Sequence, residues 1–77
     1  ESGKLVFNNT PFREALNDIG DYYNLEIEFD PEVENDVRSI SINAEFDNQS
    51  LSQVSEEIQM MTGLTISQKG STLSVQR

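Results

Sequence analysis

Acidic side chains occupy every second position along one stretch of this 77-residue chain. The members of this acidic run are Glu26, Glu28, Asp30, Glu32, Glu34 and Asp36. Paired carboxylates can serve as general acid and base in hydrolysis, and grouped carboxylates can bind calcium. The run lacks the D-x-[DN]-x-[DN]-G pattern of a calcium loop, and carboxylates on the solvent face of a strand lack the burial that a general acid needs. We interpret the run as a solvated strand face that continues into a charged loop, with a carboxylate-dependent hydrolase as the enzymatic alternative.

Other catalytic chemistry lacks its usual residues, because the chain contains no histidine and no cysteine. A serine or threonine nucleophile would have no histidine base, and a zinc site would lack its common ligands. The absence of cysteine also excludes a disulfide framework. We therefore expect a protein without catalytic activity and without a cofactor or metal.

The charge balance restricts the partners. With 14 acidic and 5 basic residues the net charge is −9, and the basic residues are scattered along the chain. Nucleic acid and anionic membrane surfaces are poor partners, since binding them requires clustered lysine and arginine. No apolar run approaches the roughly 18 residues of a membrane-spanning helix. The chain begins with Glu-Ser-Gly, so we expect residues 1–4 to be a tag or linker remnant and residues 5–77 to form a single domain.

Hydrophobic periodicity predicts five strands and two helices. Apolar residues alternate with polar ones, as in half-buried strands, over residues 4–9, 25–30, 39–46, 64–67 and 72–76. Gly70 is placed to turn the last two strands into a hairpin. The proline and the dense charge of residues 31–38 predict a loop.

Each predicted helix has an apolar face and end signals. The first is predicted to begin with Thr10 as its cap and Pro11 in its first turn, and to end at Asn24. The second is predicted to begin near Ser50, which could form a capping box with Gln53, and to end at Gly63. The predicted core faces comprise Phe12, Ala15, Leu16, Ile19, Tyr22 and Tyr23 in the first helix and Leu51, Val54, Ile58 and Met61 in the second.

The two halves of the chain repeat each other. An offset of 39 residues places residues 7–28 over residues 46–67 without a gap. Identical pairs are Phe7/Phe46, Asn9/Asn48, Ile19/Ile58, Leu25/Leu64 and Ile27/Ile66. We interpret this as a duplicated strand-helix-strand unit. The predicted fold is α+β, in the order β-α-β-β-α-β-β, with two helices packed with two small sheets, each sheet covered on one face.

Two surfaces outside the repeat are candidates for contact with a partner protein. A small sheet has edge strands that can accept another strand through backbone hydrogen bonds. The last strand carries few charges to guard it, so partner binding is predicted at Thr72, Leu73, Ser74 and Val75. Met60 falls opposite the core face of the second helix, and an exposed methionine is typical of adaptable protein interfaces.

The sequence also resembles a known family. The segments LVFNNTPFREALNDIGDYYNLEIEF, ISINAEFDNQSLSQVSEEIQMMTGLTI and GSTLSV are similar to the C-terminal domain of FecR-like anti-sigma regulators. They resemble, more distantly, the short N-terminal domain of secretins and TonB-dependent transducers. The most telling motifs lie at Phe7–Phe12, Tyr23–Ile27 and Phe46–Leu51. Ser55 departs from the family, which usually has an apolar residue there.

The resemblance implies a fold, a location and partners. The family fold places two helices between two small sheets. The domain would lie in the periplasm, joined to the inner membrane by one upstream helix of the full-length protein. It would bind the signalling domain of an outer-membrane TonB-dependent transporter and relay the signal to an extracytoplasmic-function (ECF) sigma factor. The alternative is the signalling or short domain of a TonB-dependent transducer or a secretin.

Overall fold

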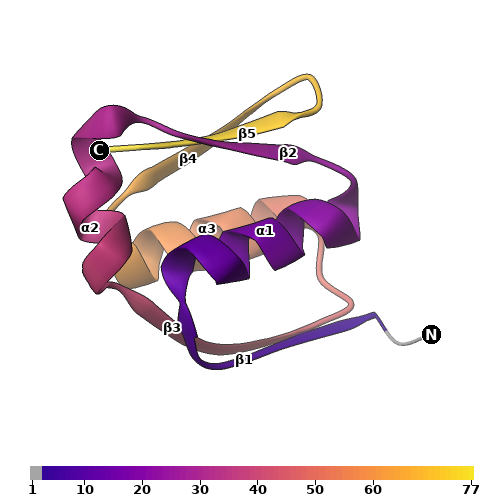
Figure 1. Cartoon of the computed structure of the whole chain (residues 1–77). Coiled ribbons are helices and arrows are strands. Elements are labelled where there is room, and N and C mark those ends of the chain that lie inside the picture. The colour runs from indigo at the N-terminus through magenta and orange to yellow at the C-terminus, as the bar shows by residue number, and fades with distance from the viewer. Residues whose placement is uncertain (1–2) are drawn as a thin grey trace.

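Two small sheets enclose a pair of helices in the computed structural model, which describes residues 3–77 (Figure 1). The elements are β1 (Lys4–Pro11), α1 (Phe12–Tyr23), β2 (Glu26–Phe29), the 3-10 helix η1 (Pro31–Val33), α2 (Glu34–Ser39), β3 (Ser41–Asp47), α3 (Leu51–Thr62), β4 (Thr65–Lys69) and β5 (Thr72–Gln76). The expected remnant at residues 1–4 falls partly outside the described residues, and Lys4 already belongs to β1.

The sheets differ in size and in strand direction. β1 pairs with β3 in an antiparallel two-stranded sheet. The other sheet has the order β2-β5-β4, with β5 parallel to β2 and antiparallel to β4. Helices α1 and α3 lie between the sheets, and α2 bridges the sheets at one end (Figure 1). The predicted α+β class and the sandwiched helices are confirmed.

The backbone repeats with the offset seen in the sequence. Helices α1 and α3 each have 12 residues and begin and end 39 residues apart. Positive φ angles recur at the same offset, at 49° and 57° for Asn9 and Asn48 and at 62° and 77° for Asn24 and Gly63. Asparagine and glycine tolerate this left-handed conformation better than other residues do. The duplicated unit is therefore confirmed, and β5 fills the position between the second strands of the two units.

The core is built from the inner faces of both sheets and the facing sides of α1 and α3. Phe7 and Phe46, the matched residues of the two units, contact each other edge-to-face with ring centroids 6.2 Å apart. Helix α1 buries five residues, namely Phe12, Ala15, Leu16, Ile19 and Gly20. Helix α3 buries only Val54 and Ile58, because the counterparts of Phe12, Leu16 and Gly20 are the half-exposed residues Leu51, Ser55 and Gln59. Ser55, the position that departs from the family pattern, lies on this less buried flank of α3.

Residues 31–38 are not a loop, contrary to the prediction. They form η1 and most of α2. The Asp30 carboxylate accepts a hydrogen bond from the Glu32 N–H at 2.9 Å and caps the first turn. Val33 and Val37, one helical turn apart, are buried in the core. The charged residues of the segment point outward, and this explains why its composition resembled that of a loop.

Two further expectations about the helices are wrong. Thr10 does not cap α1, because β1 continues through Pro11, which occupies the cap position without any side-chain hydrogen bond. The core faces are also narrower than predicted, because Tyr22 and Met61 are exposed, at 37% and 45% of their residue surface. Each lies in the last turn of its helix, after the buried residues. The capping box of Ser50 and Gln53 and the helix ends at Asn24 and Gly63 are confirmed.

Candidate protein interface

The strand predicted to bind a partner through its edge, Thr72–Val75, lies in the middle of its sheet. β5 pairs with β2 on one side and with β4 on the other, so its backbone N–H and C=O groups already form hydrogen bonds within the sheet. The prediction of strand addition at this segment is therefore wrong. Sequence periodicity gives the faces of a strand but not its neighbours, and the free edges of this sheet belong to β2 and β4.

The side chains of β5 point alternately to the core and to solvent. Leu73 and Val75 are buried, whereas Thr72 and Ser74 are half-exposed on the outer face. The register places Thr72 between Glu26 and Lys69, in the first row of this face. Ser74 occupies the next row, between Glu28 of β2 and Ser67 of β4. The outer face is therefore polar, with its carboxylates along β2.

Met60 belongs to a different surface. Its side chain is 80% exposed on α3, in the helical layer, and Met61 is exposed beside it. The outer face of β5 points away from that layer, so the structure does not bring Met60 together with Thr72 and Ser74 (Figure 1). The expectation that Met60 is exposed is confirmed.

The acidic run divides into two parts. In its second half, Glu34 accepts two hydrogen bonds from Arg13, at 2.9 and 3.1 Å, and Asp36 pairs with Arg77 at 3.0 Å. These pairs tie α2 to α1 and to the C-terminus, so this half has a structural role. Within residues 3–77, acidic side chains do not gather into a group that could hold a metal ion.

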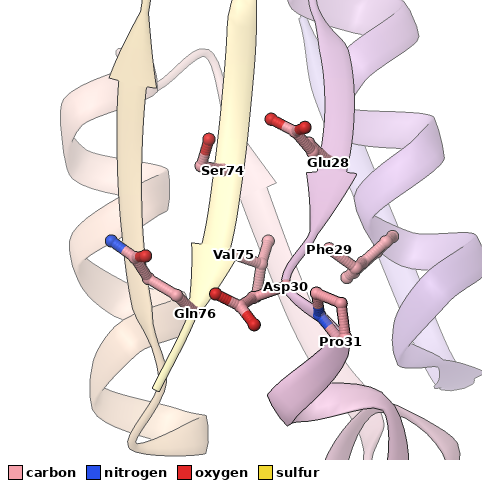
Figure 2. A pocket seen from close by; sticks show the side chains of 7 residues that line it. All are labelled: Glu28, Phe29, Asp30, Pro31, Ser74, Val75 and Gln76. Carbon is pink, nitrogen blue, oxygen red and sulfur yellow. The ribbon is translucent and has the colours of Figure 1, made fainter.

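Two shallow hollows lie at the two ends of β2. The first, about 230 Å³ in volume, lies where the parallel strands β2 and β5 end, and Glu28, Asp30, Ser74 and Gln76 supply its polar lining (Figure 2). The second, about 320 Å³ in volume, lies at the start of β2. Its lining residues are Gly20, Asp21, Asn24, Leu25, Glu26 and Ser71. The sequence did not single out Gly20 or Asp21, although the repeat aligns Gly20 with Gln59 and so marks a difference between the units.

Among residues 3–77, the two groups with clearly shifted pKa values are Lys4 and Tyr23, and neither lines a hollow. On the outer face of the two-stranded sheet, a hydrogen bond from Lys4 to Glu45, strengthened by that carboxylate's charge and by Asp47, raises the pKa of Lys4. Burial raises the pKa of Tyr23, whose hydroxyl donates to the Gln49 carbonyl at 2.6 Å. Both groups join elements of the fold, and neither arrangement resembles a catalytic pair.

Comparison with known proteins identifies the domain. The family model described as FecR, C-terminal matches residues 4–75, nearly the whole chain. This chain belongs to the FecR C-terminal family. Two crystal structures of a proposed anti-sigma factor from Parabacteroides distasonis are similar to it, each with 36% sequence identity and a TM-score of 0.86. No curated protein sequence matches the chain.

The structural similarity extends over nearly all of this chain. It covers 99% of this chain but only 34% of each Parabacteroides protein, so the chain spans about a third of the length of those relatives.

Every helix in residues 3–77 is too short or too polar to cross a lipid bilayer.

Proposed function

We propose that this FecR C-terminal domain is the signal-receiving part of an anti-sigma regulator and acts in the periplasm. It binds the signalling domain of an outer-membrane TonB-dependent transporter, and the regulator relays that event to an ECF sigma factor. The observation that carries the proposal is the family match over residues 4–75, together with the similarity to the proposed anti-sigma factor of Parabacteroides distasonis.

The surface chemistry agrees with a binding role. The carboxylates of the acidic run form ion pairs within the fold, lie on the open face of the sheet, or lie at and in η1, and none of these settings supplies a buried acid and base. Thr72 and Ser74 lie on that face next to Glu26 and Glu28 and are proposed as contact residues. Leu73 and Val75 act through the core, and Met60 is a separate proposed contact on α3.

A titration tests this proposal. The 77-residue chain, labelled with ¹⁵N, is titrated with the signalling domain of the TonB-dependent transporter encoded beside it. We expect saturable shifts of backbone amides confined to one surface. A signalling domain from a transporter encoded elsewhere serves as the specificity control. The absence of any shift at millimolar excess of the cognate domain would contradict the proposal.

A further inference from the structure

The two free edges of the three-stranded sheet differ at matched positions of the repeat. On β4, the Gln59 side-chain oxygen accepts a hydrogen bond from the Ile66 N–H at 2.9 Å. The 39-residue offset matches Ile66 with Ile27 of β2 and Gln59 with Gly20 of α1. Glycine has no side chain, so the Ile27 N–H lacks the cap that covers its counterpart. One edge is partly closed by a helix, and the other is open.

The hydrogen bonds of β2 show which of its backbone groups face outward. The N–H groups of Glu26 and Asp30 donate to carbonyl oxygens beside and within β5, at 2.8 and 2.9 Å. Successive residues of a strand direct these groups to opposite sides. Ile27 and Phe29 therefore present their N–H and C=O groups away from β5, in the arrangement that an added strand requires.

Local packing keeps this edge open. A Cβ atom at Gly20 would lie 2.7 Å from the Leu25 carbonyl oxygen and 3.1 Å from side-chain carbons of Ile27. A glutamine like Gln59 therefore does not fit at position 20 without displacing backbone. The hollow of about 320 Å³ beside Gly20 lies at the same end of β2.

Charge distinguishes the open edge as well. Glu26 and Glu28 stand on the outer face of β2, where β4 has Thr65 and Ser67 at the matched positions. Asp21 joins Glu26 at one hollow, and Asp30 joins Glu28 at the other (Figure 2). Lys4, Arg13, Arg38 and Arg77, four of the five basic residues, are engaged in ion pairs with Glu45, Glu34 and Asp36. None of the ion pairs among residues 3–77 involves the four carboxylates that line the hollows, namely Asp21, Glu26, Glu28 and Asp30.

We infer that the β2 edge accepts an extended segment of the partner protein that carries lysine or arginine at every second position. Its backbone would pair with Ile27 and Phe29, and its basic side chains would lie beside Glu26 and Glu28. Opposite charges on neighbouring strands are favourable, whereas like charges directly opposite are unfavourable. A second copy of this chain is therefore a poor occupant, since two β2 edges would bring these carboxylates together. The identity of the partner rests on the proposed function, whereas the edge and its charge preference do not.

Amide hydrogen exchange tests the pairing. In the free domain we expect fast exchange at Ile27 and Phe29 and slow exchange at Glu28 and Ile66. The cognate signalling domain should slow Ile27 and Phe29 and leave Ile66 unchanged. A short peptide of alternating threonine and lysine at millimolar concentration probes the edge independently of that partner, and a peptide of alternating threonine and glutamate is its control.

Charge reversal tests the preference. The double variant Glu26→Lys/Glu28→Lys should raise the Kd for the signalling domain about tenfold, since two favourable cross-strand pairs become repulsive. Glu45→Lys/Asp47→Lys on β3, in the other sheet, gives the same change in net charge and should leave the Kd within about twofold, because both residues are exposed outside the proposed contact surfaces and act only through the screened long-range field. Circular dichroism confirms that both variants fold.

The outcomes separate the inference from the proposed function. If the signalling domain binds but Ile27 and Phe29 stay unprotected, the edge inference is wrong and the proposed function stands. If the lysine peptide protects these amides and the signalling domain does not bind at all, the edge inference stands and the proposed partner is wrong. If neither probe protects them and the signalling domain does not bind, both are wrong. Equal effects of the two double variants on the Kd would overturn the charge preference.

Discussion

The two units of the domain share a backbone but are stabilised in different ways. The first unit, β1-α1-β2, buries five residues of its helix, and no side chain caps that helix. The second unit, β3-α3-β4, buries two helical residues and has a capping box at Ser50. Its hydrogen bonds continue at the other end of α3, where the Thr62 hydroxyl bridges the Ile58 carbonyl and the Leu64 N–H.

This contrast shows how a duplicated unit can diverge without losing its fold. Positions that fix the chain direction, such as Asn9 and Asn48, are the same in both units. At positions that only contribute to stability, the first unit has apolar contacts where the second unit has local hydrogen bonds. The exchange of Gly20 for Gln59 belongs to this second group, yet it also determines whether a side chain caps the sheet edge.

The largest difference in stability between matched substitutions of the two units is expected at the first core residue of each helix. Phe12 is fully buried and contacts Phe29 edge-to-face, whereas its counterpart Leu51 is only partly buried. Phe12→Ala should lower the free energy of unfolding by about 3–5 kcal/mol, the usual loss for a buried aromatic. Leu51→Ala should lower it by about 1–2 kcal/mol, because less apolar area leaves water. Urea unfolding at neutral pH measures both.

Phe12→Leu is the control, since it retains most of the buried volume and should cost less than about 1.5 kcal/mol. Equal losses for Phe12→Ala and Leu51→Ala would contradict the view that the first unit depends more on packing. A domain of this length has a total stability of roughly 4–12 kcal/mol, so the loss expected for Phe12→Ala is a large part of the total. This variant is therefore best measured at low temperature, with ligand-free protein.

The next largest effect on stability is expected at Gly20, one of the two matched residues that distinguish the sheet edges. In an unconstrained helix Gly→Ala stabilises by up to about 1 kcal/mol. At Gly20 the new Cβ would lie 2.7 Å from the Leu25 carbonyl oxygen, so Gly20→Ala should instead destabilise by roughly 1–3 kcal/mol. Thermal unfolding gives the sign directly, and a stabilised variant would show that the edge has room for a side chain.

Gln59→Ala is the matched change in the second unit. It removes the hydrogen bond to the Ile66 N–H and should cost about 0.5–1.5 kcal/mol. Ile66 should then exchange its amide hydrogen as fast as Ile27 does. Unchanged exchange at Ile66 would contradict the role assigned to Gln59.

A smaller effect is expected at the start of α3. Ser50→Ala removes the side-chain acceptor of the Gln53 N–H and breaks the capping box. The expected loss is about 1 kcal/mol, measured by urea unfolding. Ser52→Ala, in the same helical turn and exposed, is the control and should be neutral or slightly stabilising. If both variants unfold alike, the cap contributes nothing measurable.

Features determined by neighbouring residues were predictable from the sequence. Asn24 and Gly63 end helices because the chain must turn there, and Ser50 with Gln53 is a local signal. The repeat itself was visible in the sequence, and it determined the fold class. Helix α2 was missed although Val33 and Val37 are one helical turn apart and Asp30 is a possible cap, because two apolar residues among dense charge are too weak a pattern to outweigh a composition typical of a loop.

The candidate site was less predictable, since it depends on the order of strands. Alternation places Thr72 and Ser74 on a polar face, but only the topology shows that β5 is central and β2 is an edge. The alignment of Gly20 with Gln59 was available from the sequence. That Gln59 reaches the Ile66 N–H depends on how α3 packs beneath β4, and this required the structure.

The smallest effect is a change in the pH dependence of stability at alkaline pH, to which Tyr23 contributes and its counterpart Thr62 does not. Burial raises the pKa of Tyr23 above its ordinary value of 10.0, so the folded state holds the proton more tightly than the unfolded state does. The stability from this hydroxyl is complete below pH 10.0 and is lost as the pH rises through the folded-state pKa. Tyr23→Phe should therefore flatten the alkaline fall in the free energy of unfolding.

The same variant should cost about 1 kcal/mol at neutral pH, because the hydrogen bond to the Gln49 carbonyl is lost. Lys4, whose pKa is also raised, keeps part of the alkaline fall in both proteins, so the informative quantity is the difference between the two curves. Urea unfolding at a series of pH values gives that difference. Parallel curves would mean that Tyr23 ionises as readily in the folded as in the unfolded state, and equal stability at neutral pH would mean that its contact with Gln49 contributes nothing measurable.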